Sequence, residues 1–326
     1  MKVLAGDIGG TNARLAVVSE GRILFERWYP ARDFPDFETV MGRFASEWGR
    51  PLPDLGCLAV AGAVQDNRVR ATNLPWTIDG DELASRFGLS ALRLANDFEA
   101  AAAGVLALAP EDLVQLGGGP PEPDRPKAVL GPGTGLGQAI LVPCRGRYEV
   151  VPTEGGHADF APPDAEAAGL LAALADRYGH VSVERVLSGP GLVETYRYFF
   201  RAAEEAGVPP LRDPAEISRA GMEGSDPTAR RALDLFRRVL AAEAGNLALR
   251  CLAGGGVYLA GGIAPKILPV LREPAFRRAF EAKGRMAGLL ARIPVFVVVH
   301  PAVGLVGAAR LAAAGPEQAP ARAETA

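Results

Sequence analysis

The sequence predicts a layered α/β protein with mixed sheets flanked by helices and with two related halves. Short apolar runs that read as strands alternate with amphipathic or alanine-rich segments, which is typical of a sheet covered by helices. A strand–glycine turn–strand unit opens the chain, and a similar unit begins near residue 128. The polar loop GGGPPEPDRP at 117–126 separates the halves, because its glycines and prolines exclude regular structure.

The first half begins with three strands. The turn residues Ser19, Glu20 and Gly21 make the second and third strands a hairpin. Asp79 is a plausible N-cap for the helix that follows it. The predicted strands are 3–7, 14–18, 23–27, 58–60 and 92–95, and the predicted helices are 36–48, 79–87 and 97–108.

The second half is richer in helix. Its predicted strands are 128–130, 138–142, 257–260 and 295–299, and its predicted helices are 164–178, 191–205, 227–252, one from residue 265 and 303–313. We expect a small α/β domain of residues 1–108 plus 298–315, a large α/β domain of residues 109–297, and a flexible tail at 316–326.

Composition excludes several classes of protein. The 326 residues are 48% hydrophobic and 22% charged, as in globular proteins with a buried core. The net charge of −3 provides no basic surface for nucleic acid or an anionic membrane. The cysteines Cys57, Cys144 and Cys251 are too far apart in sequence to suggest a disulfide framework or a metal cluster. With no signal peptide or membrane-spanning segment expected, we predict a cytoplasmic protein.

The first of three glycine-rich elements is DIGGTNAR at 7–14, between two predicted strands. Gly9 and Gly10 allow a tight turn whose backbone N–H groups can approach phosphate oxygens. Asp7, at the end of the first strand, can hold a hydrated magnesium ion. A strand-end glycine pair alone is more often only a turn.

The other two glycine elements lie in the second half. GPGTGLG at 131–137 again connects strands, and its amides and the Thr134 hydroxyl suit further phosphates. In GGGVYLAGGI at 254–263, a strand ends in Gly261 and Gly262, which suits a flat adenine ring. The sequence contains neither a Walker A motif nor a dinucleotide-binding fingerprint, the other common glycine-rich nucleotide sites. The three elements together indicate nucleotide binding.

Two polar segments suit a sugar hydroxyl and its proton. Asn96 and Asp97 follow an apolar strand and open a helix, so Asp97 could accept the proton of an attacking hydroxyl. Spacing alone leaves open that Asp97 is simply an N-cap. Glu154 and His157, on a glycine-rich loop, could pair with ring hydroxyls, although an isolated histidine is more often structural.

From residue 7 to about 307 the chain resembles the bacterial glucokinase family, which has the two-domain actin-like ATPase (ribonuclease H-like) fold. The segments that carry the resemblance are DIGGTNARLA at 7–16, ANDFEA at 95–100, LGPGTGLG at 130–137, EGGHADFAP at 154–162 and GHVSVERVLSGPGL at 179–192. The resemblance implies transfer of the ATP γ-phosphate to the 6-hydroxyl of glucose, two domains that close on the sugar, and a homodimer. It also singles out Glu184, which would otherwise read as an ordinary solvated residue.

We therefore expect Asp97 to be the catalytic base and Asp7 to hold Mg²⁺ through water. The expected glucose ligands are Asn96, Asp97, Glu154, His157 and Glu184. The expected ATP-binding residues are Asp7, Gly9, Gly10, Thr11, Asn12, Gly133, Thr134, Gly135, Gly261 and Gly262.

Two alternatives remain at this point. A broader hexokinase would also act on mannose, fructose or glucosamine. An actin-like ATPase switch would keep the glycine turns, but it would have no need of Asn96, Asp97, Glu154 and His157. The zinc-binding cysteine cluster of the related ROK sugar kinases is absent from the sequence, which argues against a sugar-responsive repressor.

Overall fold

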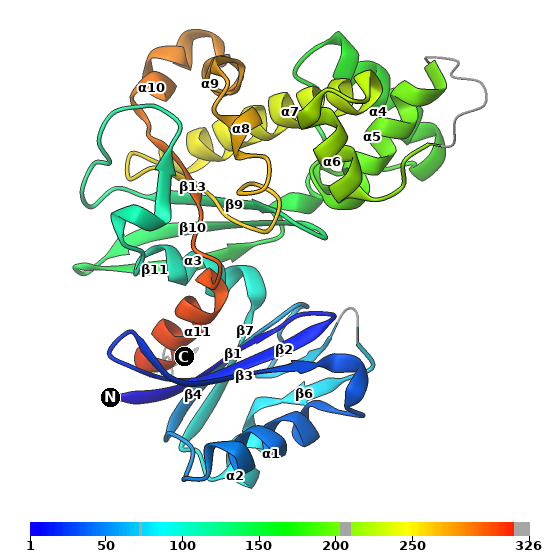
Figure 1. Ribbon diagram of the computed structural model, residues 1–326. Helices are drawn as coiled ribbons and strands as arrows, with labels where there is room; N and C mark the ends of the chain where they lie inside the picture. Colours follow the sequence, from blue (N-terminus) through cyan, green and yellow to red (C-terminus); the bar gives the residue numbers. More distant parts are fainter. Residues whose placement is uncertain (72–73, 203–209, 316–326) are drawn as a thin grey trace, which may run out of the picture. The chain divides into compact units, whose positions relative to one another are not determined.

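The computed structural model describes residues 1–71, 74–202 and 210–315 of the chain (Figure 1). Contacts between Cα atoms divide it into two compact units, of which unit 1 is Met1–Leu108 with the chain from His300, and unit 2 is Ala109–Val299. The predicted tail at 316–326 lies outside the described residues, as does the predicted end of one helix at Glu205. The predicted domain limits remain a proposal.

Unit 1 is built on a five-stranded mixed sheet in the order β3-β2-β1-β4-β7. The first three strands form an antiparallel meander, and β4 and β7 then run parallel to β1. The strands are β1 (Lys2–Ile8), β2 (Asn12–Ser19), β3 (Arg22–Pro30), β4 (Leu55–Val60) and β7 (Ala91–Asn96), and a separate pair consists of β5 (Arg68–Arg70) and β6 (Thr77–Asp79).

Helices flank this sheet. Its apolar side chains pack with those of α1 (Phe37–Trp48) and α2 (Gly80–Phe87) in one core. α3 (Asp97–Val105) and α11 (Val303–Ala313) pack closely together (Figure 1). A Cβ atom on Gly104 or Gly307 would collide with the backbone of the opposite helix, so small residues are needed where these helices meet. This explains the alanine-rich composition of α3.

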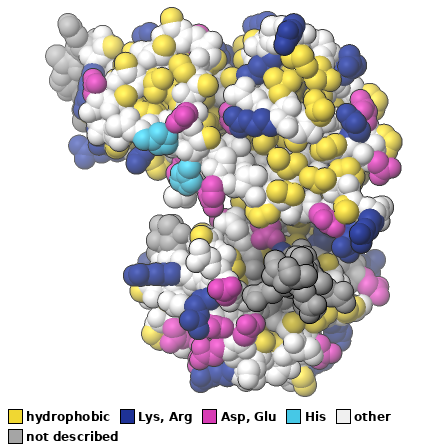
Figure 2. Space-filling model, turned by 180° about the vertical axis from the view of Figure 1, so that it is seen from behind, with side chains coloured by type: hydrophobic (Ala, Val, Ile, Leu, Met, Phe, Trp, Pro, Cys, Tyr) yellow, Lys and Arg dark blue, Asp and Glu magenta, His cyan; other side chains and the backbone are white. Residues whose placement is uncertain are grey.

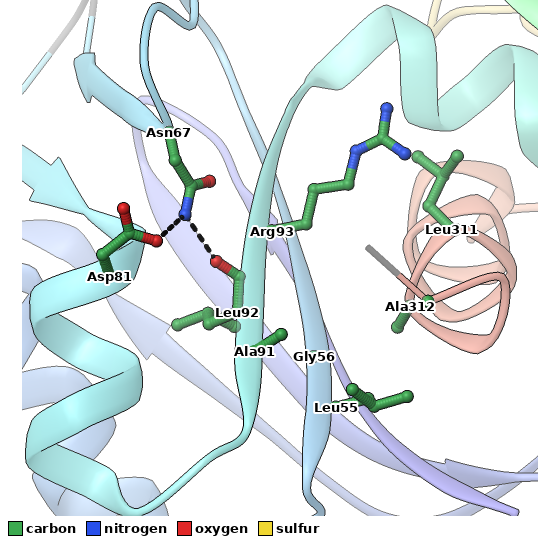
Figure 3. Close-up of a pocket in the computed structure, with 10 residues that line it drawn as sticks. Leu55, Gly56, Asn67, Asp81, Ala91, Leu92, Arg93, Leu311 and Ala312 are labelled. Carbon is green, nitrogen blue, oxygen red and sulfur yellow. Dashed lines mark hydrogen bonds between the residues drawn. The ribbon is translucent and has the colours of Figure 1, made fainter. Parts of the chain in front are cut away.

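Asn67 covers the free edge of β7 in unit 1. Its side-chain amide donates to the Leu92 carbonyl at 2.9 Å and to Asp81 at 2.7 Å (Figure 3). Its side-chain oxygen accepts from the Leu94 N–H at 2.7 Å. The side chain thereby replaces the peptide group of a neighbouring strand and satisfies an edge that would otherwise be unpaired. A Cβ atom on Gly80 would overlap this amide, so glycine is required there.

Unit 2 contains a six-stranded mixed sheet in the order β11-β10-β9-β12-β13-β8. An antiparallel meander is again followed by two parallel strands, and β8 closes the far edge antiparallel to β13. The strands are β8 (Leu113–Gln115), β9 (Lys127–Pro132), β10 (Leu136–Cys144), β11 (Arg147–Thr153), β12 (Val257–Leu259) and β13 (Val295–Val298). The shared order of the two sheets confirms the predicted α/β class with related halves.

The helices of unit 2 form its main core with the sheet. They are α4 (Ala165–Tyr178), α5 (Gly189–Ala202), α6 (Pro214–Glu223), α7 (Pro227–Cys251), α8 (Leu268–Leu271), α9 (Pro274–Glu281) and α10 (Ala287–Arg292). Short 3-10 turns occur at η1 (Ala31–Asp33), η2 (Pro110–Asp112), η3 (Gly155–His157), η4 (Val183–Arg185) and η5 (Gly284–Met286). Within the described ranges, every helix is too short or too polar to cross a lipid bilayer.

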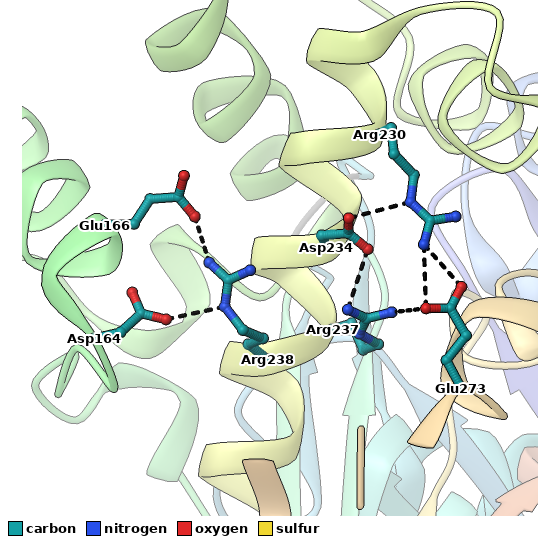
Figure 4. Close-up of polar contacts among 7 residues, drawn as sticks. All are labelled: Asp164, Glu166, Arg230, Asp234, Arg237, Arg238 and Glu273. Atoms are coloured by element: carbon teal, nitrogen blue, oxygen red, sulfur yellow. Dashed lines mark hydrogen bonds and ion pairs between the residues drawn. The ribbon is translucent and has the colours of Figure 1, made fainter. Parts of the chain in front are cut away.

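Arginines of α7 connect this long helix to its neighbours (Figure 4). Arg230 pairs with Glu273 at 2.8 Å, and the buried Arg237 pairs with the same carboxylate. Arg238 binds Asp164, the N-cap of α4, at 2.9 Å. Because Glu273 is the N-cap residue of α9, these pairs join α7 to the starts of two other helices.

The structure corrects several expected elements. The prediction missed the strands β5, β6, β8 and β11 and the helices α6, α9 and α10. The helix expected from Pro265 begins only at Leu268 and is a single turn. β13 belongs to the sheet of unit 2, so that only α11 returns to unit 1. Prediction succeeded for helices that start at an aspartate, such as α1 and α2, because Asp36 and Asp79 accept backbone N–H groups as N-caps.

Candidate active site

The first glycine turn lies in unit 1 between β1 and β2. The Gly9 N–H donates to the Asn12 carbonyl at 3.0 Å, which closes the turn. Gly10, Thr11 and Asn12 are exposed, so their backbone groups are accessible to a ligand. The structure therefore places the predicted residues of this segment together at one sheet end.

Asp7 lies at the end of β1, next to the first turn of α11. A Cβ atom on Gly304 would stand 3.2 Å from the Asp7 carboxylate, so glycine leaves room for it. Burial raises the pKa of Asp7, while the charge of Arg14 on β2 opposes that shift. The start of a helix also favours an anion at this position.

This carboxylate fits a magnesium ion that keeps most of its water. Mg²⁺ prefers oxygen ligands and is usually held by one or two carboxylates together with phosphate oxygens. Asp7 provides one such carboxylate beside a phosphate-type turn. Residues 1–71, 74–202 and 210–315 contain no group of three or more His, Cys, Asp or Glu side chains placed to enclose a metal ion.

Asn96 and Asp97 lie where β7 ends and α3 begins. Asn96 is the N-cap, because its side-chain oxygen accepts from the N–H groups of Phe98 at 2.8 Å and Glu99 at 3.3 Å. Its amide also donates to the Gly62 carbonyl at 3.1 Å, which leaves one amide hydrogen for a ligand. Asp97 is the first residue of the helix and is exposed. The alternative that Asp97 is the N-cap is therefore wrong.

The second glycine turn joins β9 to β10 in unit 2. The Gly133 N–H donates to the Gly135 carbonyl at 2.8 Å, and the Gly133 carbonyl accepts from the N–H of Gly189, the first residue of α5, at 2.9 Å. Thr134, at the tip, is exposed. The turn is thus fixed from both sides while its tip remains open.

The third glycine element packs directly on the end of β9. The Ile263 N–H donates to the Pro132 carbonyl at 3.3 Å. Gly261 has a φ of +79°, and a Cβ atom on it would stand 2.7 Å from the Pro132 carbonyl oxygen. The fold of unit 2 therefore brings Gly261 and Gly262 to the second glycine turn, as expected for a common nucleotide site.

The predicted sugar loop is the 3-10 turn η3 with Glu154 before it. The His157 Nε2 atom lies 3.7 Å from the Glu154 carboxylate, and both side chains are well exposed, at 63% and 78%. His180 pairs with Asp159 at 2.8 Å, and Asp159 also forms an isolated β-bridge with Ser182. Figure 2 shows histidine side chains beside acidic ones on the surface of this unit. These open polar groups can reach sugar hydroxyls.

Glu184 is brought to the same place by backbone pairing. The Val183 N–H donates to the Ala158 carbonyl at 2.9 Å, which holds η4 against the end of the sugar loop. The Glu184 carboxylate accepts from the Leu136 N–H at 2.8 Å, at the end of the second glycine turn. Unit 2 therefore brings together the two segments that carry Glu154, His157 and Glu184.

Comparison with known proteins agrees with this geometry. The glucokinase family model matches residues 4–315. A glucokinase of Nostoc punctiforme is 41% identical over 336 aligned residues, covering 95% of this chain and 98% of the relative. The chain belongs to the glucokinase family.

Solved structures of glucokinases share the fold. A glucokinase from an Antarctic psychrotroph superposes with a TM-score of 0.86 at 33% identity, covering 96% of this chain and 99% of that one. The glucokinase of Balamuthia mandrillaris, in complex with glucose, gives a TM-score of 0.81 at 25% identity, covering 96% and 93%. This glucokinase-family chain thus has the actin-like ATPase fold, and its activity is the phosphorylation of glucose.

Sequence reasoning missed supporting residues in this glucokinase-family site. Gly304 is distant in sequence from Asp7, which it accommodates. Gln138, which lies against Gly155 of the sugar loop, is buried at 2% exposure. Its side chain is hydrogen bonded to that of Glu243, which is buried at 4% exposure. A glutamine within the apolar strand LGQAILV was the available signal for a buried polar contact.

Proposed function

We propose that this chain transfers the γ-phosphate of ATP to the 6-hydroxyl of glucose, with glucose 6-phosphate and ADP as products. The observation that supports it is that the segments carrying Glu154, His157 and Glu184 pair with each other beside the glycine turn of unit 2. Carboxylate and imidazole groups suit sugar hydroxyls, and the exposed amides of a glycine turn suit phosphate.

Asp97 is proposed as the general base. The O6 atom of glucose attacks the γ-phosphorus, the bond to the bridging oxygen breaks, and ADP leaves with that electron pair. The hydroxyl proton passes to the Asp97 carboxylate. Asn96, fixed as the N-cap of α3, holds its remaining amide hydrogen in place for the sugar.

The nucleotide is proposed to bind the glycine elements. The ligands in unit 1 are Asp7, Gly9, Gly10, Thr11 and Asn12, and those in unit 2 are Gly133, Thr134, Gly135, Gly261 and Gly262. Mg²⁺, held by Asp7 through water, would neutralise phosphate charge. We also propose that the protein is cytoplasmic and that it forms a homodimer. Sedimentation analysis of the purified protein would test the dimer.

The direct test is a coupled assay of glucose 6-phosphate formation with Mg-ATP. Asp97→Asn removes the proton acceptor and keeps the shape, so we expect turnover to fall by at least about a hundredfold. Sugar-independent ATP hydrolysis that is unchanged in Asp97→Asn would instead favour an actin-like ATPase.

Glu99→Gln is the matched control. Glu99 lies in the same helical turn, but its carboxylate is bound to Arg93 at 2.6 Å. Removing this charge should leave turnover close to that of the native protein. Equal loss in both variants would show that the turn, rather than the Asp97 carboxylate, is what matters.

A further inference from the structure

The predicted sugar ligand Glu184 contacts the second glycine turn of unit 2, the phosphate turn at 131–137. Glu184 Oε2 accepts from the Leu136 N–H at 2.8 Å, and Leu136 is the residue that follows Gly135. The same carboxylate oxygen lies 2.5 Å from where a Cβ atom on Gly135 would stand. Glu184 is therefore seated in space that the missing side chain of Gly135 leaves open.

The two glycines of this turn differ in this respect. A Cβ atom on Gly133 would meet no atom within 4 Å, whereas one on Gly135 would meet only the Glu184 carboxyl group. Neither residue has a left-handed backbone, so alanine is conformationally allowed at both. What requires glycine at 135 in this structure is therefore the neighbouring carboxylate.

Leu136 also contacts the sugar loop. A Cβ atom on Gly156 would collide with the Leu136 carbonyl oxygen, so this loop packs directly on the Leu136 backbone. The N–H and the carbonyl group of this one residue thus contact η4 and η3, the elements that carry Glu184 and His157. A shift of Leu136 would therefore move both elements.

We propose that Gly135 is a positioning residue for the sugar, and that Glu184 couples glucose binding to the phosphate turn through the Leu136 N–H. Glucose held by Glu184 keeps this carboxylate on Leu136 and so keeps the turn in one conformation. ATP therefore binds more tightly when glucose is present, and by linkage glucose binds more tightly when the nucleotide is present. This inference rests on the proposed role of Glu184 as a glucose ligand.

The test measures glucose binding by calorimetry, with and without a non-hydrolysable ATP analogue. Gly135→Ala displaces the Glu184 carboxylate, so we expect the glucose dissociation constant without nucleotide to rise by about tenfold or more. In the native protein we expect the glucose dissociation constant without nucleotide, divided by that with nucleotide, to exceed one. In Gly135→Ala this ratio should fall toward one. Gly288→Ala in α10, where an added Cβ atom would also meet no atom within 4 Å, should bind glucose as the native protein does.

Each other outcome has a defined meaning. Native glucose affinity in Gly135→Ala, or a native protein whose glucose affinity ignores the nucleotide, overturns the coupling. A native protein that neither binds nor phosphorylates glucose overturns the proposed function itself. If Gly135→Ala does not fold, Glu184→Asp and Glu184→Gln replace it. The shorter aspartate cannot reach the Leu136 N–H and should lose the ratio, whereas glutamine can still accept from it and should keep the ratio.

Discussion

The buried pair Gln138–Glu243 offers a sharp test of how the sugar loop is supported. Gln138 Nε2 donates to Glu243 Oε1 at 3.1 Å, and the Glu243 carboxylate also accepts from Asn246 at 2.9 Å and Arg250 at 3.1 Å. A Cβ atom on Gly155 would overlap the other end of the Gln138 amide, so the loop rests on this side chain. The perturbations are Gln138→Leu, Glu243→Leu and the double variant.

The magnitudes follow from what each change leaves behind. Gln138→Leu removes one hydrogen bond to a buried charge, which costs about 2 kcal/mol and, for a unit of this size, lowers Tm by roughly 4–8 °C. Glu243→Leu leaves the Gln138 amide buried without its acceptor and also removes the acceptor of Asn246 and Arg250, so it should cost more than Gln138→Leu. The double variant leaves neither the Gln138 amide nor the Glu243 carboxylate without its partner. Its destabilisation should therefore be smaller than the sum of the two single-variant losses by about 1 kcal/mol or more.

The assay combines thermal unfolding with steady-state kinetics. Because Gln138 supports the loop that carries Glu154 and His157, both single variants should raise KM for glucose more than they lower kcat. Val142→Leu, at an exposed position of the same strand β10, should change stability by less than about 0.5 kcal/mol.

Two results would refute this reasoning. Additive losses in the double variant would mean that the two side chains act independently. A fall in kcat with an unchanged KM for glucose would mean that the pair does not position the sugar loop.

Two further predictions concern unit 1. Because burial raises the pKa of Asp7, the folded protein holds its proton more tightly than the unfolded chain, and the ionised group lowers stability as pH rises through the folded pKa. Asp7→Asn should therefore lose activity, yet at pH 8 its Tm should equal or exceed that of the native protein. At pH 4 the difference in Tm should be smaller. A Tm below that of the native protein at pH 8 would contradict this reasoning. Asn67→Ala should cost about 1–3 kcal/mol in urea unfolding and speed amide exchange at Leu94, because the β7 edge loses its partner. Asp66→Ala, at a neighbouring position that also has a positive φ of 48°, carries only the backbone cost, so equal effects in the two variants would rule out the edge pairing.

Local sequence determined the elements and the identity of the candidate site. A strand that ends in glycines predicts a tight turn, and an aspartate before an apolar helix predicts an N-cap, and both patterns involve only a few adjacent residues. Asp36, Asp79 and Asp226 are N-caps in the structure. The sequence analysis did not predict β11, because its residues are largely exposed or half-buried and it contains Pro152, which is unfavourable in a strand.

Tertiary structure alone decided which distant residues support the site. Glu184 and Leu136, Gln138 and Glu243, and Asp7 and Gly304 meet only after the sheets and helices have packed. Their pairing depends on strand order and helix packing over long sequence separations, and no local propensity records it. The sequence therefore determined which groups could bind phosphate and sugar, and packing determined which residues hold those groups in place.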